Sequence, residues 1–184
     1  MNLPKEVTIV EVGPRDGFQN VDDWIPTEVK LKVIHSLFEA NLKNMEITSF
    51  VHPKAIPQMK DAGDVVQEVL DKVKDVEAAA LVPNFFGAES AWKSGLKQIT
   101  YVISASERHN MENVKRTIEE SFAELRSLKE RIPSLKIKLD IATAFGCPFQ
   151  GDIPVEQVFK MIDNGIAVGV DEICLCDTIG IANP

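Results

Sequence analysis

The amino-acid sequence predicts an α/β fold whose strands run parallel. Three observations support this prediction: short apolar runs rich in β-branched residues recur along the chain, amphipathic segments separate them, and proline or glycine stands near several segment ends. Regular alternation of strand and helix is typical of parallel sheets whose strands are joined by helical crossovers. The 184 residues show no internal linker, low-complexity tract or composition break, so we expect one domain.

Six segments have the length and composition of buried strands, and each is followed by polar residues or glycine. They are Val7–Val12, Asn44–Thr48, Glu77–Val82, Gln98–Ile103, Lys136–Ala144 and Glu172–Cys176. The amphipathic segments between them predict helices. These are Thr27–Ala40, Gly63–Val73, Ala88–Ser94, Asn110–Arg131 and Pro154–Asp163.

Several of the predicted helices have chemical signals at their ends. Proline followed by Thr27 favours a helix start, and Asn110 is expected to cap the long fourth helix. Pro133 prevents that helix from continuing past Arg131. Gly165 is expected in the left-handed conformation that ends the last predicted helix.

Composition excludes several classes of protein. The net charge of -8, without any block of Lys and Arg, argues against a nucleic-acid partner. The N-terminal apolar run is too short for a signal peptide, and no stretch reaches the ~20 apolar residues of a membrane span. We therefore expect a cytoplasmic protein without a membrane partner.

The three cysteines are Cys147, Cys174 and Cys176, and no pair has CxxC spacing. Their small and odd number argues against a disulfide scaffold and against a structural zinc site, so reduced thiols are expected. Because Cys174 and Cys176 alternate with apolar residues in a predicted strand, both should point to the same face.

Two architectures fit the alternation, a doubly wound sheet and a (β/α)8 barrel. A nucleotide-binding sheet normally carries a glycine-rich phosphate loop after its first strand, whereas Gly13-Pro14-Arg15-Asp16-Gly17 stands there. Polar and reactive side chains follow several predicted strands, as they do at the carboxyl ends of barrel strands. They are Arg15, Asp16, Glu46, Thr48, Ser49, Asn84, Ser104, Ser106, Glu107 and Asp177. The sequence therefore favours the barrel.

The segment VEVGPRDGFQN at Val10–Asn20 resembles the first-strand motif of the 3-hydroxy-3-methylglutaryl-CoA lyase family. Later segments resemble that family in the same order: MEITSFVHPKAIPQM, SASERHN, IEESF, GCPFQG and CDTIGIANP. The first and last motifs are shared more loosely with other metal-dependent barrel enzymes. One departure is Cys176, which stands where the family commonly has glycine.

The resemblance implies a barrel lyase that cleaves 3-hydroxy-3-methylglutaryl-CoA to acetyl-CoA and acetoacetate with Mg2+ or Mn2+. It implies that Asp16 is a metal ligand and that Arg15 stabilises the enolate of the thioester. Glu46 and Asp177 are placed in the active site as catalytic residues. Gln19, Ser49, Ser104 and Ser106 are expected to bind the CoA thioester substrate.

Structural alternatives remain for several of these residues. Glu46 could form a buried ion pair that only supports the site, and Asp177 could cap the turn that follows it. Ser104 and Ser106 could be turn formers beside Glu107. Cys147 could line the site or simply pack in the core.

In the family, further metal ligands come from a His-x-His pair on the seventh strand and from a later asparagine, which this chain of about six βα units lacks. The resemblance thus implies a truncated barrel that is inactive alone, and a homodimer at full length. Two other hypotheses stay open, a Claisen-type acyltransferase of the isopropylmalate or citramalate synthase kind and an inactive binding or assembly module.

Overall fold

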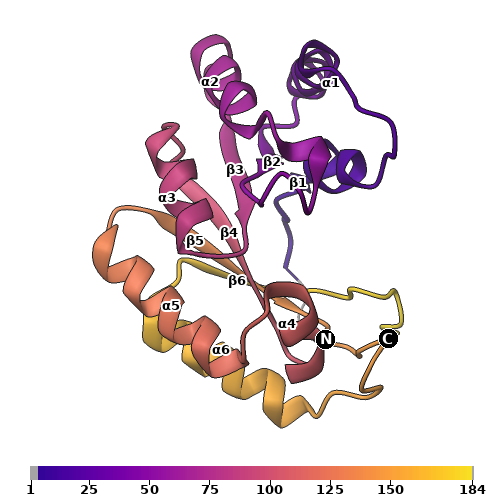
Figure 1. Cartoon of the computed structure of the whole chain (residues 1–184), viewed down its shortest axis with the longest axis vertical. Coiled ribbons are helices and arrows are strands. Elements are labelled where there is room, and N and C mark those ends of the chain that lie inside the picture. Colours follow the sequence, from indigo (N-terminus) through magenta and orange to yellow (C-terminus); the bar gives the residue numbers. More distant parts are fainter. Residues whose placement is uncertain (1–3, 184) are drawn as a thin grey trace. The chain divides into compact units, whose positions relative to one another are not determined.

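The computed structural model describes residues 4–183, and within them six strands alternate with six α-helices. This alternation confirms the predicted α/β class (Figure 1). The chain divides into two compact units, one of residues 4–81 and 90–96 and the other of residues 82–89 and 97–183. No helix within the described residues is long and apolar enough to cross a membrane.

The first unit holds β1 (Val10–Glu11), the π-helical turn η1 (Gly13–Gly17), α1 (Thr27–Glu39), β2 (Asn44–Ser49), the 3-10 turn η2 (Pro57–Met59), α2 (Ala62–Lys72) and most of β3 (Glu77–Val82). The second unit holds β4 (Gln98–Ser104), α4 (Glu107–Val114), α5 (Ile118–Arg131), β5 (Lys136–Ala142), α6 (Val155–Val168) and β6 (Glu172–Leu175). Helix α3 (Phe85–Lys93) has residues in both.

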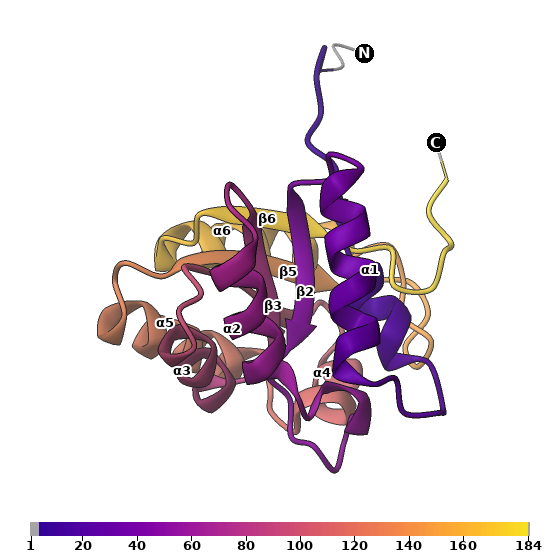
Figure 2. The same cartoon turned by 90° about the horizontal axis from the view of Figure 1, so that it is seen from above.

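The sheet of the first unit consists of parallel strands in the order β1-β2-β3. Helices α1 and α2 pack against each other, and α2 also lies against β2 (Figure 2). The core between these elements is made of buried aliphatic side chains, which favour the fold by leaving water. They include Met45, Ile47, Val65, Val66 and Val69.

The first strand is shorter than the sequence predicts. Only Val10 and Glu11 pair with β2, and Val7 and Ile9 are exposed. The reason is the register, because Val10 is aligned with Asn44, the first residue of β2, so earlier residues have no ladder partner there. At its other end the strand stops where the Glu11 carboxylate accepts a 2.6 Å hydrogen bond from the Gly13 amide.

The sheet of the second unit consists of parallel strands in the order β4-β5-β6. Helices α5 and α6 pack against each other along one face of these strands (Figure 1). Apolar residues of β5 alternate toward these helices, which is the period expected of a strand. They are Ile137, Leu139 and Ile141.

Gly165 does not end the last helix, contrary to the sequence-based prediction. It lies inside α6, which continues to Val168 and ends at Gly169, whose φ is 80°. A Cβ atom on Gly165 would lie 2.9 Å from Leu139 Cδ2 and 3.2 Å from Ile173 Cδ1. The glycine therefore lets α6 pack closely on β5 and β6 without displacing these side chains, and the left-handed cap falls at the next glycine.

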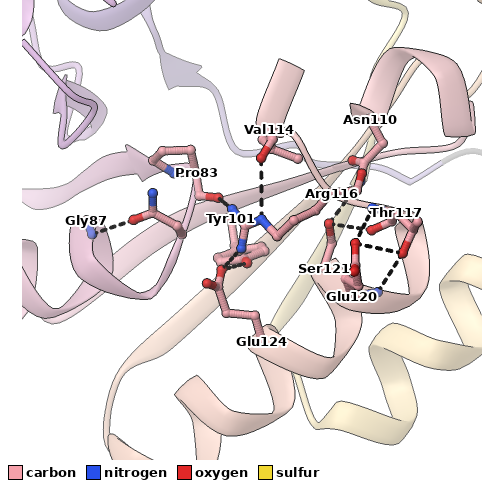
Figure 3. Close-up of polar contacts among 11 residues, drawn as sticks. Pro83, Gly87, Tyr101, Asn110, Val114, Arg116, Thr117, Glu120, Ser121 and Glu124 are labelled. Atoms are coloured by element: carbon pink, nitrogen blue, oxygen red, sulfur yellow. Dashed lines mark hydrogen bonds and ion pairs between the residues drawn. The ribbon is translucent and has the colours of Figure 1, made fainter. Parts of the chain in front are cut away.

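The predicted long helix Asn110–Arg131 is two helices, so that prediction was wrong. Ser106, at the N-terminus of α4, accepts a hydrogen bond from the His109 amide, and α4 ends at Lys115 with a φ of 57°. Thr117 and Glu120 then form a reciprocal capping box that starts α5 (Figure 3). Lys115, in the left-handed conformation, thus ends α4, and the cap at Thr117 starts α5, so the chain does not continue as one helix.

Asn110 also has a different role from the predicted cap. Its buried side chain accepts a hydrogen bond from the Ser104 amide and donates to Arg116 O and Ser121 Oγ, at 3.0, 2.9 and 2.9 Å. Asn110 therefore joins the end of β4 to the corner between α4 and α5, and Figure 3 shows its place beside Arg116 and Ser121 in that corner. The side-chain amide thus satisfies the carbonyl oxygen of Arg116, which lies between the two helices, and the amide at the end of β4.

Arg116 fixes the same corner from its other side. Its guanidinium donates to the Glu124 carboxylate and, at 2.7 Å, to the carbonyl oxygen of Pro83 (Figure 3). The buried Tyr101 hydroxyl also donates to Glu124 at 2.5 Å, and burial together with this carboxylate raises the pKa of Tyr101. The corner is consequently held to β4 and to the segment that follows β3.

Candidate active site

A π-helical turn presents Arg15 and Asp16 after the first strand. The amides of Arg15 and Asp16 both donate to the carbonyl oxygen of Val12, at 3.0 and 2.6 Å. Pro14 is buried inside the turn and anchors it. Turns of this kind are uncommon and recur at functional sites, and here the turn brings two neighbouring charged side chains together.

Arg15 is paired with Glu46 of β2. Its Nε and Nη2 atoms each lie 2.9 Å from Glu46 Oε2. The glutamate side chain is only 1% exposed and that of Arg15 is 12% exposed, so the charges neutralise each other away from water. Glu46 thus forms the buried ion pair that the sequence analysis left open for it, with Arg15 as the partner.

A local irregularity positions Glu46. The register between β2 and β3 aligns Glu46 with Ala79 but Thr48 with Ala80, so β2 carries an extra residue, Ile47, at this point. Such a bulge bends a strand and changes the direction of its side chains, and bulges are frequent beside active sites. The Arg15–Glu46 pair therefore lies where the strand departs from regular pairing.

Asp16 and Gln19 complete the group in the first unit. Arg15 Nη1 donates to Asp16 Oδ1 at 2.6 Å, and Gln19 Nε2 donates to the same oxygen at 3.1 Å. Half of the Asp16 side chain, 51%, is exposed. A carboxylate that is oriented by two donors and still open to solvent is a suitable oxygen ligand for a hard cation. We call Arg15, Asp16, Gln19 and Glu46 the arginine cluster.

Ser49 lies at the end of β2 and is completely buried. Its hydroxyl has no hydrogen-bond partner within residues 4–183, so no bond joins it to the arginine cluster. A buried hydroxyl without a partner is unfavourable, and a bound polar group could satisfy it.

In the second unit, Ser104 and Ser106 belong to one polar group at the end of β4. Ser104 Oγ lies 2.5 Å from His109 Nδ1, and burial lowers the pKa of that imidazole. Ser106 Oγ donates to the side chain of Gln150 and accepts from Cys147 Sγ at 3.1 Å. The segments SASERHN and GCPFQG, far apart in the sequence, thus meet here.

Cys147 is not a merely inert core thiol. It is buried, and burial alone would raise its pKa, but its contact with Ser106 and the hydrogen bond that it accepts from the Phe149 amide outweigh this and lower the pKa. The sequence-based interpretation left open whether Cys147 lines the site or packs. The structure places it beside Ser106.

Asp177 follows β6 and bonds to the loop that comes after it. Its two carboxylate oxygens accept hydrogen bonds from the amides of Ile181 and Ala182, both at 3.0 Å. This is the capping arrangement that the sequence left as an alternative for Asp177. In the described residues no hydrogen bond joins Asp177 to Ser104 or Ser106.

Sequence analysis missed Thr143, which follows β5. Its φ of 57° is rare for a β-branched residue, its side chain is buried, and its hydroxyl lacks a partner in residues 4–183. Its amide donates to Thr178 Oγ1 at 2.7 Å. The sequence offered one signal for Thr143, namely its place near the end of a strand-like run. The predicted strand, however, extended through Thr143 to Ala144.

Comparison with known proteins identifies relatives along the whole chain. The HMGL-like family model matches residues 6–184. The hydroxymethylglutaryl-CoA lyase of Bacillus subtilis is 44% identical over all of this chain, which spans 62% of that protein. The crystal structure of the Bacillus subtilis HMG-CoA lyase matches with a TM-score of 0.93 and likewise covers 100% of this chain and 62% of that one.

A second solved structure adds a ligand. An HMG-CoA lyase from Acinetobacter baumannii, in complex with coenzyme A and 3-methylmalate, is 36% identical with a TM-score of 0.91. The match covers 95% of this chain and 57% of that one. These matches confirm the predicted fold, the barrel of the HMG-CoA lyases, over a chain that spans about three fifths of its relatives' length.

Proposed function

The chain belongs to the HMGL-like family, and from this we propose that it acts in the metal-dependent cleavage of 3-hydroxy-3-methylglutaryl-CoA to acetyl-CoA and acetoacetate. The observation that carries the proposal is the arginine cluster. It combines a charge-paired guanidinium with an oriented, solvent-open carboxylate. Cleavage of a carbon–carbon bond next to a thioester needs a cation at the developing enolate and activation of the hydroxyl group.

The orientation of Arg15 suits a hydrogen bond to the thioester oxygen of the substrate. Glu46 holds its Nε and Nη2 atoms and Asp16 holds Nη1, so the orientation of the guanidinium is set before substrate binds. The terminal nitrogens carry further N–H groups that could bond an enolate oxygen. Glu46 is then a positioning residue, which acts through Arg15.

Asp16 is suited to Mg2+ or Mn2+. Its exposed carboxylate offers the hard oxygen donor that these ions prefer, and the donors Arg15 and Gln19 orient it. When bound, such an ion would lower the pKa of the substrate hydroxyl.

The remaining predicted residues are proposed to contact substrate. Coenzyme A in the Acinetobacter baumannii enzyme supports a CoA thioester as the ligand. The unpartnered hydroxyl of Ser49 favours a polar substrate group there. Ser104 and Ser106 are proposed to bind substrate, Asp177 is proposed to take part in catalysis, and the whole protein is proposed to form a homodimer.

The test of the metal assignment is Asp16→Asn, which keeps the volume and removes the charge. We expect the affinity for Mg2+ or Mn2+ to fall by at least about 10-fold in a metal titration, with little change in thermal stability. Asp22→Asn, at a nearby exposed aspartate, is the matched control and should bind metal as the unaltered protein does. Equal affinity of the Asp16 variant would show that this residue only shapes the turn.

The reaction itself is tested in a version of the chain extended to the length of its relatives, because the 184 residues alone are expected to be inactive. This version is incubated with 3-hydroxy-3-methylglutaryl-CoA and Mg2+, and acetoacetate is measured. Condensation of acetyl-CoA with a 2-oxoacid would instead identify the Claisen-type acyltransferase. Metal binding without either reaction would favour the binding module.

A further inference from the structure

Three potential metal ligands gather on one face of β5 and β6. Asp140 and Cys174 are register partners on these parallel strands, and Cys176 follows Cys174 by two residues. Leu139 and Ile173, which precede Asp140 and Cys174, lie against Gly165 of α6. Because side chains alternate along a strand, Asp140 and both thiols project from the opposite face.

The positions of the donor atoms match a tetrahedral site. The two sulfur atoms are 4.0 Å apart, and one oxygen of Asp140 completes a triangle in which all donor atoms lie within 4.8 Å of one another. Two thiolates bound to one tetrahedral Zn2+ at about 2.3 Å each would be about 3.8 Å apart. The sulfur spacing already present is therefore close to that of a coordinated pair.

The backbone holds this arrangement in place. The amide of Cys176 donates to Ile141 O at 3.0 Å, and the carbonyl oxygen of Cys176 accepts from the Ala144 amide at 3.2 Å. The ladder between β5 and β6 thus extends past the last residue of β6. Ligands that are fixed by regular backbone pairing lose little entropy when they bind a metal.

The electrostatics of the cluster also favour a cation. The thiol of Cys176 donates to Cys174 Sγ, which lowers the pKa of Cys174 to about 7 and raises that of Cys176. The ammonium of Lys138 lies 3.7 Å from Asp140 Oδ1.

The donors of the cluster are anionic when they bind a metal. Two thiolates and one carboxylate carry three negative charges, and Glu172 adds a further negative charge near Cys174, against one positive charge on Lys138. A divalent cation would therefore offset most of the excess negative charge. Sulfur donors select zinc over magnesium, which prefers oxygen alone.

We propose that Asp140, Cys174 and Cys176 form a binding site for Zn2+, with a fourth position open to water or to an added ligand. This departs from the sequence analysis, which expected reduced thiols without a metal role. The proposal does not depend on the lyase assignment, because none of these residues belongs to the arginine cluster.

The alternative to metal binding is a disulfide bond between the sulfur atoms of Cys174 and Cys176. Residues two apart on a strand have Cα atoms about 6.6 Å apart, near the upper end of the range that a disulfide spans. The sulfurs would have to approach from 4.0 Å to about 2.05 Å, whereas zinc needs only a small adjustment. The geometry therefore favours the metal.

The experiment is a Zn2+ titration of the reduced, chelator-treated protein in excess Mg2+, which occupies sites made of oxygen donors. We expect one Zn2+ per chain, and Cys174→Ser should weaken its binding by at least about 100-fold. Cys147→Ser is the matched control at the third cysteine and should bind Zn2+ normally. Co2+ in place of Zn2+ should give thiolate charge-transfer absorption that Cys174→Ser abolishes.

A second measurement separates loss of the site from loss of folding. Zn2+ should protect Cys174 and Cys176 from alkylation in the unaltered protein, mapped by mass spectrometry, and Mg2+ should not. Asp140→Asn should reduce this protection while both thiols remain. Unchanged Zn2+ affinity in Cys174→Ser, absence of stoichiometric binding, or a Cys174–Cys176 disulfide that forms in the presence of Zn2+ would each overturn the proposal.

Discussion

Polar residues follow strands in both units, but they are used differently. In the first unit, Arg15, Asp16 and Glu46 bond mainly to one another's side chains. In the second unit, Ser106 and Asp177 bond to backbone amides of the segment that follows them. The same position in the sequence pattern thus gives a charge network in one unit and capped turns in the other.

A position after a strand therefore predicts where a side chain lies, but it does not predict which group that side chain bonds. A guanidinium needs acceptors and a carboxylate needs donors, so Arg15 and Glu46 can satisfy each other across the turn and β2. Serine and aspartate have an alternative in the nearest free amides. Substitutions in the two regions should accordingly disturb different properties.

The largest expected effect is on activity, from Arg15→Lys in the arginine cluster. A compact ammonium cannot reproduce the planar fork by which separate nitrogens of Arg15 contact Glu46 and Asp16 and face an enolate oxygen. In the version extended to the length of its relatives, we expect kcat/KM for acetoacetate formation to fall by more than about 100-fold, or about 3 kcal/mol, with the fold retained. Arg126→Lys, at an exposed arginine, is the control. Near-normal turnover would remove Arg15 from the reaction.

Glu46→Gln should mainly affect stability. It leaves the guanidinium of Arg15, which is only 12% exposed, without its buried counter-charge. We expect the free energy of unfolding to fall by about 2 kcal/mol in urea denaturation, less than for a fully buried pair because Asp16 still contacts Arg15. A change below about 0.5 kcal/mol would mean that solvent already screens this pair.

In the second unit, Thr143 tests whether backbone strain is stored at a strand end. Replacement by Gly and by Ala removes the same buried hydroxyl, but only Gly adopts a φ of 57° without strain. We expect Thr143→Gly to be more stable than Thr143→Ala by about 1 kcal/mol. The reverse order, measured by urea denaturation, would place the strain elsewhere.

The smallest effect should come from Asp171, at the opposite end of β6 from Asp177. Burial alone would raise the pKa of Asp171, but hydrogen bonds from the Ile137 amide and Lys129 outweigh it and lower the pKa. The ionised carboxylate therefore stabilises the folded state above the ordinary aspartate pKa, and this contribution is lost as pH falls through the lowered value.

Asp171→Asn should then reduce stability by less than about 1 kcal/mol near pH 7, because the side chain is 45% exposed. The difference from the unaltered protein should shrink as the pH is lowered below 4 in thermal unfolding experiments. A difference that does not change with pH would assign the effect to the shape of the side chain rather than to its charge.

Much of the fold could be predicted because strands and helices have periodic signals. The bounds of Glu77–Val82 and the stop before Pro133 follow from local chemistry alone. The break at Lys115 could not be predicted, because it depends on Asn110 bonding residues beyond its own helix. Likewise, Gly165 looked like a helix end, but packing on Leu139 decides its role.

The residues of the candidate site could likewise be predicted only in part from the sequence. The family motifs contain Arg15, Asp16 and Glu46, and the structure brings them together, because the charge of Arg15, after β1, and that of Glu46, within β2, can satisfy one another. The strain at Thr143 and the contact between Ser106 and Gln150 depend on tertiary packing. No local pattern in the sequence encodes either of them.

The corner between α4 and α5 has a consequence for folding kinetics. Its hydrogen bonds join residues close in sequence: Asn110 to Arg116, Asn110 to Ser121, and Thr117 to Glu120. Closing such short loops takes little chain entropy, whereas pairing β4 with β5 brings together Gln98 and Lys136 across two helices. We therefore expect the corner to form early and to shorten the search of these strands for their register, so that Asn110→Ala slows refolding more than it speeds unfolding.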